Sequence, residues 1–180
     1  GMVEEVRNKL GSDFNCIVAD AEKIPFKDAY FDSIIANHVL FYLNDLNQGL
    51  KEIRRVLKSN GVLYCSTYGS KHMKEITDIV QSFDSRINLS NHSLYDVFGL
   101  ENGESILKEY FISVQRMDYQ DSLEITESKP LIDYIMSCHG NQNEILGPKL
   151  NEFKEYIEEL LVNNGKIIVT KQASLFICEN

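Results

Sequence analysis

The chain has 180 residues, of which 43% are hydrophobic and 25% charged, a composition that suits one folded domain with a sizeable core. Its 18 basic and 27 acidic residues give a net charge of −9, which argues against broad binding to the phosphate backbone of nucleic acids. No apolar run approaches the about 20 residues of a membrane span, and the charged start GMVEEVRNKL is unlike a signal peptide. We therefore expect one cytoplasmic domain that binds neither nucleic acid nor membrane.

The first third of the sequence predicts a helix followed by two strands. Residues 2–10 have an amphipathic helical pattern, and Gly11 follows them where a C-cap glycine is common. Residues 15–19 and 31–36 are short apolar runs typical of buried strands, with Pro25 in the loop between them.

The next segment predicts a strand–helix–strand unit. Asn44 or Asp45 can cap a helix whose apolar residues recur at helical spacing, and we expect Gly61 to end it. Residues 62–67 then form an apolar run typical of a strand. Because such a unit joins parallel strands by a right-handed crossover, we expect 31–36 and 62–67 to pair in parallel.

The second half also mixes the two element types. We expect helices near residues 73–83, 104–110, 130–137 and 150–160, and strands near 111–119 and 166–178. A change of alternation predicts a bulge near Gln115, and another irregularity is expected at 171–172. The last two strands are separated by two helices, so they can pair in either direction. This order of elements predicts an α/β protein with a three-layer sandwich.

The cysteines and histidines form no metal-binding pattern. The sequence has no CxxC pair and no Cys/His cluster with zinc spacing. Three cysteines lie in apolar runs and are expected to be buried free thiols in a reducing compartment: Cys16, Cys65 and Cys178. Three histidines lie outside any motif and are expected at the surface or in loops: His72, His92 and His139.

Four segments, in this order, resemble class I S-adenosylmethionine-dependent methyltransferases of the type 11 group. DAEKIPF at 20–26 and FDSIIANHVLFYL at 31–43 resemble the family pattern DAExLPF…FDxVxxxxxLxxL, and RRVLKSNGVLYCSTYG resembles the segment that follows it. FGLENGESILKEYF and MDYQDSLEIT resemble the carboxy-terminal half of a small-molecule subgroup. The resemblance implies a Rossmann-like α/β/α sandwich, a mixed sheet with antiparallel C-terminal strands, S-adenosylmethionine as cofactor and a small-molecule methyl acceptor. A dehydrogenase relative would need a GxGxxG motif, which the sequence lacks.

The resemblance also implies cofactor-binding residues at the end of the run 15–19. Asp20 matches the acid that binds the adenine amino group, and Ala21 matches the residue whose backbone N–H meets the ring. Ligands of open α/β sheets bind beyond the carboxyl ends of the strands, where Asp20 is expected. The alternative is that Asp20 only caps a turn, since Asp is a common turn former.

Asn37 and His38 follow the next strand, near the expected methionine part of the cofactor and the transferred methyl group. His38 is a candidate general base, because histidine is the side chain that most often serves as a general base in enzymes. The alternative is that it only orients the loop. Phe41 and Tyr42 are candidates for the substrate side, although aromatic residues at this spacing are more often part of a core.

Two family features are missing from the sequence. It contains no GxG pair, so it lacks the ExGCGxG-like loop that cradles the amino acid part of the cofactor, and it lacks the acid that binds the ribose. The family sheet order is 3-2-1-4-5-7-6, so the sandwich is expected to be incomplete at the N-terminus. The run 31–36 would then form an exposed edge, which we expect either 15–19 or a second copy in a homodimer to cover.

These observations leave two hypotheses about function. The chain is a truncated single domain, 1–180, of a methyltransferase whose acceptor-side region lies at about 70–130, with weak or absent cofactor binding. Alternatively, it is a non-catalytic remnant or an interaction protein that self-association stabilises.

Overall fold

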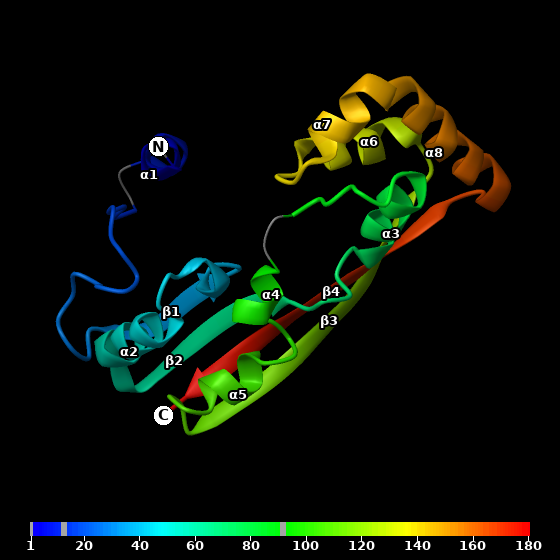
Figure 1. Cartoon of the computed structure of the whole chain (residues 1–180). Helices are drawn as coiled ribbons and strands as arrows, with labels where there is room; N and C mark the ends of the chain where they lie inside the picture. The colour runs from blue at the N-terminus through cyan, green and yellow to red at the C-terminus, as the bar shows by residue number, and fades with distance from the viewer. Residues whose placement is uncertain (1, 12–13, 91–92) are drawn as a thin grey trace.

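A mixed four-stranded sheet forms the centre of the computed structural model, which describes residues 2–11, 14–90 and 93–180 (Figure 1). Its strands are β1 (Phe31–Asn37), β2 (Leu57–Tyr68), β3 (Ser113–Ile125) and β4 (Ile167–Glu179). They lie in the order β1-β2-β4-β3, with β1 and β2 parallel and the other two pairs antiparallel. This confirms the α/β class and the predicted parallel pairing of 31–36 with 62–67. The strand order corresponds to strands 4, 5, 7 and 6 of the family sheet.

Helices occupy most of the predicted positions. The described elements are α1 (Met2–Leu10), α2 (Leu46–Val56), α3 (Lys74–Phe83), α4 (Leu94–Val97), α5 (Gly103–Leu107), α6 (Ser128–Ser137), α7 (Gln142–Leu146) and α8 (Leu150–Asn164), with 3-10 turns η2 (Leu40–Tyr42) and η3 (Gly147–Lys149). Gly11 and Gly165 end α1 and α8 with φ of +73° and +75°, a conformation that glycine adopts without steric cost.

The helices cover opposite faces of the sheet at opposite ends. Near β1, a first core joins α2 and residues 98–111 to side chains such as Cys65 and Phe176. Near the far end of β3 and β4, a second core joins α3, α6 and α8 to Val169. Alternate residues of a strand point to opposite faces, and β4 pairs with β3 without a register shift, so Val169 and Phe176 lie on opposite faces. Figure 1 shows α6–α8 beyond one end of the sheet and α2 and α5 at the other.

One part of the sheet has no helix over it. On the face opposite Phe176, a row of three side chains crosses β1, β2 and β4. Ile35 of β1 is paired with Tyr64 of β2, and Tyr64 is paired with Ile177 of β4. Ile35 is 70% exposed, and Tyr64 and Ile177 are only half-buried. This apolar row lies beside the outer edge of β1, which among the described strands pairs only with β2.

The prediction of a strand at 15–19 is wrong. This segment is irregular, and Val18 is 84% exposed, so no partner strand buries its apolar side chains. Arg7 in α1 donates a hydrogen bond to the Cys16 carbonyl at 3.1 Å, which holds the segment to α1 instead. The predicted pairing of 15–19 with 31–36 is therefore also wrong, and within the described chain β1 remains an edge strand.

Three local predictions also fail, at Gly61, near Gln115 and at 171–172. The helix α2 ends at Val56, and Gly61 lies inside β2 rather than ending a helix. A Cβ atom at Gly61 would lie 2.8 Å from the Leu57 side chain and 3.0 Å from the Asp32 carbonyl oxygen, so a close backbone approach explains the glycine. The register of β3 on β4 is continuous past Gln115 and past 171–172, so neither irregularity exists.

Two of the three cysteines expected in the core are there. Cys65 and Cys178 are buried free thiols, whereas Cys16 is only half-buried because its segment is not in the sheet. A hydrogen bond with Cys178, together with burial, raises the pKa of the Cys65 thiol. A protonated buried thiol is a poor nucleophile, so the pair is part of the core rather than a reactive site.

Candidate functional site

The loop that carries the DAEKIPF motif is fastened to the start of α2. Asp45 caps the helix by accepting the Gln48 N–H at 2.9 Å, as predicted for this position. The Glu22 carboxylate accepts the Asn44 N–H at 2.7 Å and the Asp45 N–H at 3.1 Å. The motif therefore has a structural role, since its glutamate fixes the chain that enters the helix.

Arg55 fixes the rest of the loop to α2. Its guanidinium donates to the Ile24 carbonyl at 2.9 Å and to the Phe26 carbonyl at 2.8 Å. It also pairs with Glu52 and Asp28, each at 2.8 Å, and these two hydrogen-bonded carboxylates raise the pKa of Arg55. A planar guanidinium with five donors suits this convergence of carbonyl and carboxylate oxygens.

Asp20 begins this fastened loop and is exposed. Its carboxylate Oδ1 accepts the Glu22 N–H at 2.9 Å, and its carbonyl accepts the Lys23 N–H at 3.1 Å. Asp20 thus caps a turn, as in the alternative interpretation of this residue that the sequence left open. Ala21, the next residue, is half-buried.

Asn37 and His38 lie where β1 ends. The Ser66 hydroxyl donates to Asn37 Oδ1 at 3.3 Å, and the His38 N–H donates to the Ser66 carbonyl at 3.1 Å. His38 has φ of +49°, an uncommon conformation for a residue other than glycine. The ends of β1 and β2 are thereby joined, and the backbone turns sharply at the candidate base.

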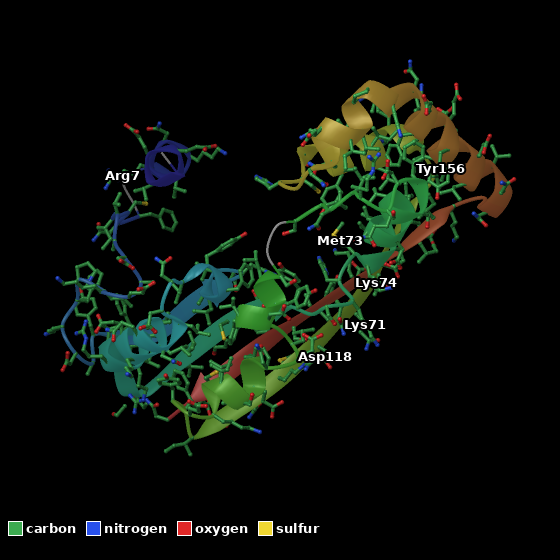
Figure 2. The ribbon with its side chains drawn as sticks, in the orientation of Figure 1. Arg7, Lys71, Met73, Lys74, Asp118 and Tyr156 are labelled. Atoms are coloured by element: carbon green, nitrogen blue, oxygen red, sulfur yellow. The ribbon has the colours of Figure 1, made fainter. Side chains whose placement is uncertain are left out.

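A cavity of about 470 Å³ opens beyond the carboxyl ends of β1 and β2. Five aromatic side chains line it: Phe41, Tyr42, Tyr68, Tyr95 and Tyr134. The other lining residues are two histidines and a set of small or apolar side chains: His38, His72, Met73, Ile76, Thr77, Leu89, Ser90 and Cys138. Figure 2 labels Met73 at the start of α3, where it accepts a 3.6 Å hydrogen bond from the Tyr134 hydroxyl. The cavity therefore lies between the sheet and the helices at its far end.

Tyr68, the last residue of β2, is the centre of the aromatic wall. Its ring centroid lies 5.3 Å from that of Phe41, 5.3 Å from His72 and 6.3 Å from Tyr95, and the His38 ring stacks on it at 6.2 Å with an interplanar angle of 22°. Burial, and then the neighbouring tyrosines, raise the pKa of Tyr68. Its hydroxyl is therefore a neutral donor or acceptor within the cavity.

His72 lies in the loop between β2 and α3, as predicted, and is half-buried in the cavity wall. Its Nδ1 accepts the Gln172 N–H at 3.1 Å, which puts the proton of the neutral ring on Nε2. Burial lowers the pKa of His72, and the charges of His38 and Lys171 lower it further. The structure thus favours neutral His72.

We expect this histidine to make the fold sensitive to mild acid. A histidine whose pKa is lower in the folded than in the unfolded chain contributes stability above its unfolded value of about 6.5, and that contribution is lost as pH falls through the folded value. Thermal unfolding between pH 7.5 and 5.5 should show a falling Tm for the wild type and a flatter profile for His72→Gln. An Asn151→Gln control, at an exposed position of α8 that does not titrate, should keep the wild-type slope. Equal slopes for wild type and His72→Gln would contradict the assignment.

The cavity brings together only part of the predicted site. His38, Phe41 and Tyr42 line it, whereas Asp20, Ala21 and Asn37 do not. Phe41 is buried and also belongs to the first core, and Tyr42 is 66% exposed at the cavity mouth. Sequence reasoning missed Tyr68, His72, Tyr95 and Tyr134. Only Tyr68 had a signal, because it lies in the STYG end of a family segment.

Other features of the described residues do not compete with this cavity. A second hollow of about 460 Å³, lined by residues such as Asp28 and Ser59, lies at the start of β2 and away from the strand ends where ligands bind. No group of three or more His, Cys, Asp or Glu with metal-binding geometry occurs among residues 2–11, 14–90 and 93–180. Over the same residues, no helix combines the length and apolarity needed to cross a bilayer.

An open mixed sheet with a cavity beyond the ends of its parallel strands defines a Rossmann-like ligand-binding domain. A family profile described as "Methyltransferase domain" matches residues 1–65. Malonyl-[acyl-carrier protein] O-methyltransferase from Methylovorus sp. is 33% identical over 163 residues, which are 87% of this chain and 53% of that protein. The chain thus spans about half the length of this relative. It belongs to the class I S-adenosylmethionine-dependent methyltransferases.

Two further proteins are similar to this chain. Arginine-hydroxylase NDUFAF5 from Danio rerio is 34% identical over 73 residues, which are 39% of this chain and 23% of that protein. The crystal structure of YcgJ protein from Bacillus subtilis has a TM-score of 0.54 at 15% identity, over 98% of this chain and 76% of that chain. The second likeness shows the fold alone.

The Asp20–Ala21 turn lies at the adenine position of the family motif. Gly69, which follows β2, cannot act as an open cradle, because a Cβ there would meet Gln172 at 2.8 Å and Glu101 at 3.0 Å. The sequence contains no GxG pair.

Proposed function

We propose that this chain supplies the acceptor side of an S-adenosylmethionine-dependent methyltransferase that acts on a small molecule. The cavity of about 470 Å³ beyond β1 and β2 carries this proposal, since it lies where open α/β sheets bind ligands. Most of its wall comes from residues 72–95, within the acceptor-side region of about 70–130. Tyr134 in α6 and Cys138 directly after this helix complete the wall.

Within this proposal, His38 is the candidate base. It lies at the end of β1, its backbone is held by the Ser66 carbonyl, and its ring stacks on Tyr68 at the cavity wall. A neutral imidazole there accepts a proton from an acceptor hydroxyl or amine. Orientation of the acceptor by the aromatic wall is the other contribution, because proximity alone accelerates transfer reactions strongly. The four free cysteines fit a reducing compartment, the cytoplasm.

We further propose that cofactor affinity is weak in this chain and that the contacts are on the adenine side, at Asp20 and Ala21, with Asn37 and His38 beside them. Titration of isotope-labelled protein with S-adenosylhomocysteine, followed by NMR, tests this. The expected result is fast-exchange shifts at the amides of these four residues, reduced in Asp20→Ala and absent with guanosine as ligand. Shifts confined to other parts of the sheet would contradict the proposed site.

The open edge of β1 favours a second candidate function, an interaction protein that forms a homodimer. Unpaired edge strands with apolar neighbours are templates for pairing with another chain. We expect a dimer by light scattering, and the Ile35→Lys variant should shift it to monomer because a charge would replace the exposed isoleucine. Ile112→Lys, at an exposed position outside the strands, is the matched control. A monomeric wild type would rule out this candidate.

A further inference from the structure

The aromatic cavity is built for an uncharged ligand. No lysine, arginine, aspartate or glutamate occurs among its described lining residues. Lys71, labelled in Figure 2 next to the start of α3, is not among them. Lys171, whose charge acts on His72, pairs with Asp121 at 3.1 Å. A charged ligand would therefore lose its hydration without gaining an ionic partner in the wall, which is costly.

Two titrating groups of the wall, Tyr68 and His72, respond to burial with pKa shifts in opposite directions. Burial raises the pKa of Tyr68, which disfavours an anion there. Burial lowers the pKa of His72, which disfavours a cation there. An environment that suppresses both signs of charge on its own side chains also disfavours both signs on a ligand.

The shape of the wall favours a flat ligand. His38 and Tyr68 lie nearly parallel, with 22° between their planes, and Tyr95 meets Tyr68 edge-on at 74°. Faces and edges of rings at these angles contact a planar ring in the stacked and T-shaped arrangements that aromatic pairs prefer. The hydroxyls of Tyr42, Tyr68 and Tyr95 and the Nε2–H of His72 can donate to one or two polar atoms of the ligand.

We propose that the methyl acceptor of this cavity is a neutral, planar aromatic compound with a hydroxyl or amine substituent. This inference rests on the proposed function, because only that function makes the ligand an acceptor. It departs from the name of the Methylovorus relative, since the malonyl group is a carboxylate and the described wall offers it no basic side chain.

Three probes that share the naphthalene ring and carry a neutral, an anionic or a cationic substituent test the inference: 2-naphthol, 2-naphthoate and 2-naphthylmethylamine. The chain contains no tryptophan, so naphthyl fluorescence reports binding without indole background. At pH 7.5 and without cofactor, we expect 2-naphthol to bind about tenfold more tightly than either charged probe. Equal or tighter binding of the anion or the cation would overturn the inference.

A matched pair of tyrosines locates the binding. Tyr42 is 66% exposed and lines the cavity, whereas Tyr119 is 62% exposed and lies on β3 outside it. Tyr42→Ala should weaken 2-naphthol binding about fivefold, and Tyr119→Ala should leave it unchanged. The same loss in both variants, or in neither, would contradict binding in this cavity.

The binding assay also separates this inference from the proposed function. Binding of 2-naphthol together with absent S-adenosylhomocysteine shifts would support the aromatic cavity and contradict the methyltransferase role. Shifts from S-adenosylhomocysteine without 2-naphthol binding would contradict the aromatic acceptor alone.

Discussion

Phe176→Ala is expected to destabilise the protein by about 3–5 kcal/mol, because the substitution removes a fully buried ring from the first core. The ring lies 6.1 Å from that of Phe98, centroid to centroid, and it faces Gly103, where a Cβ atom would come within 3.2 Å of it. The surroundings cannot collapse easily, since a sheet strand on one side and the chain at 98–103 on the other fix the cavity walls. Chemical denaturation followed by circular dichroism measures the change.

Phe14→Ala is the matched control for this substitution. Phe14 is exposed in the irregular segment before the sheet, so its removal should change the free energy of unfolding by less than about 0.5 kcal/mol. A cost below 1 kcal/mol for Phe176→Ala would contradict the assignment of Phe176 to a packed core.

Phe153→Ala is expected to lower the free energy of unfolding by a similar amount, about 3–5 kcal/mol. Its effect should be concentrated in another part of the molecule. Phe153 is fully buried in the second core, with ring centroids 5.1 Å from Phe83 and 6.2 Å from Tyr156. Tyr156 is labelled among the helices beyond the end of the sheet in Figure 2. These helices supply one wall of the cavity through Met73 and Tyr134, so the substitution should also weaken 2-naphthol binding.

Hydrogen exchange separates the two cores. In Phe153→Ala, amide protection should fall in α3, α6 and α8 while β1 and β2 stay protected, because local units of a fold can open separately. Val162→Ala, at an exposed position of α8, is the control and should leave protection unchanged. Uniform loss of protection over the whole sheet would show that the second core is not a separate unit.

The sequence predicted the elements whose signal is local. Asp45 caps α2, β1 and β2 pair in parallel, and the last strands are antiparallel in the family order, because caps, periodicity and motif order are properties of neighbouring residues. The segment 15–19 shows the limit of such signals. Its apolar pattern is typical of a strand, but a strand also needs a partner, and within the described chain none lies beside it.

The site was predictable only where a motif carried it. His38, Phe41 and Tyr42 follow the FDSIIA strand and line the cavity, whereas His72, Tyr95 and Tyr134 reach it from helices and loops distant in the sequence. Tertiary packing of α3 and α6 against the strand ends brings these side chains together, and no spacing in the sequence records that packing. The burial that lowers the pKa of His72 has the same origin.

The central claim is that this chain carries an acceptor cavity and only the adenine side of a cofactor site. Calorimetric titration with S-adenosylhomocysteine and with adenosine tests it most directly, since the two ligands share the adenine and differ in the amino acid part. We expect both to bind weakly, with affinities within about threefold of each other. Binding of S-adenosylhomocysteine about a hundredfold more tightly than adenosine, or no binding of either ligand, would contradict the claim.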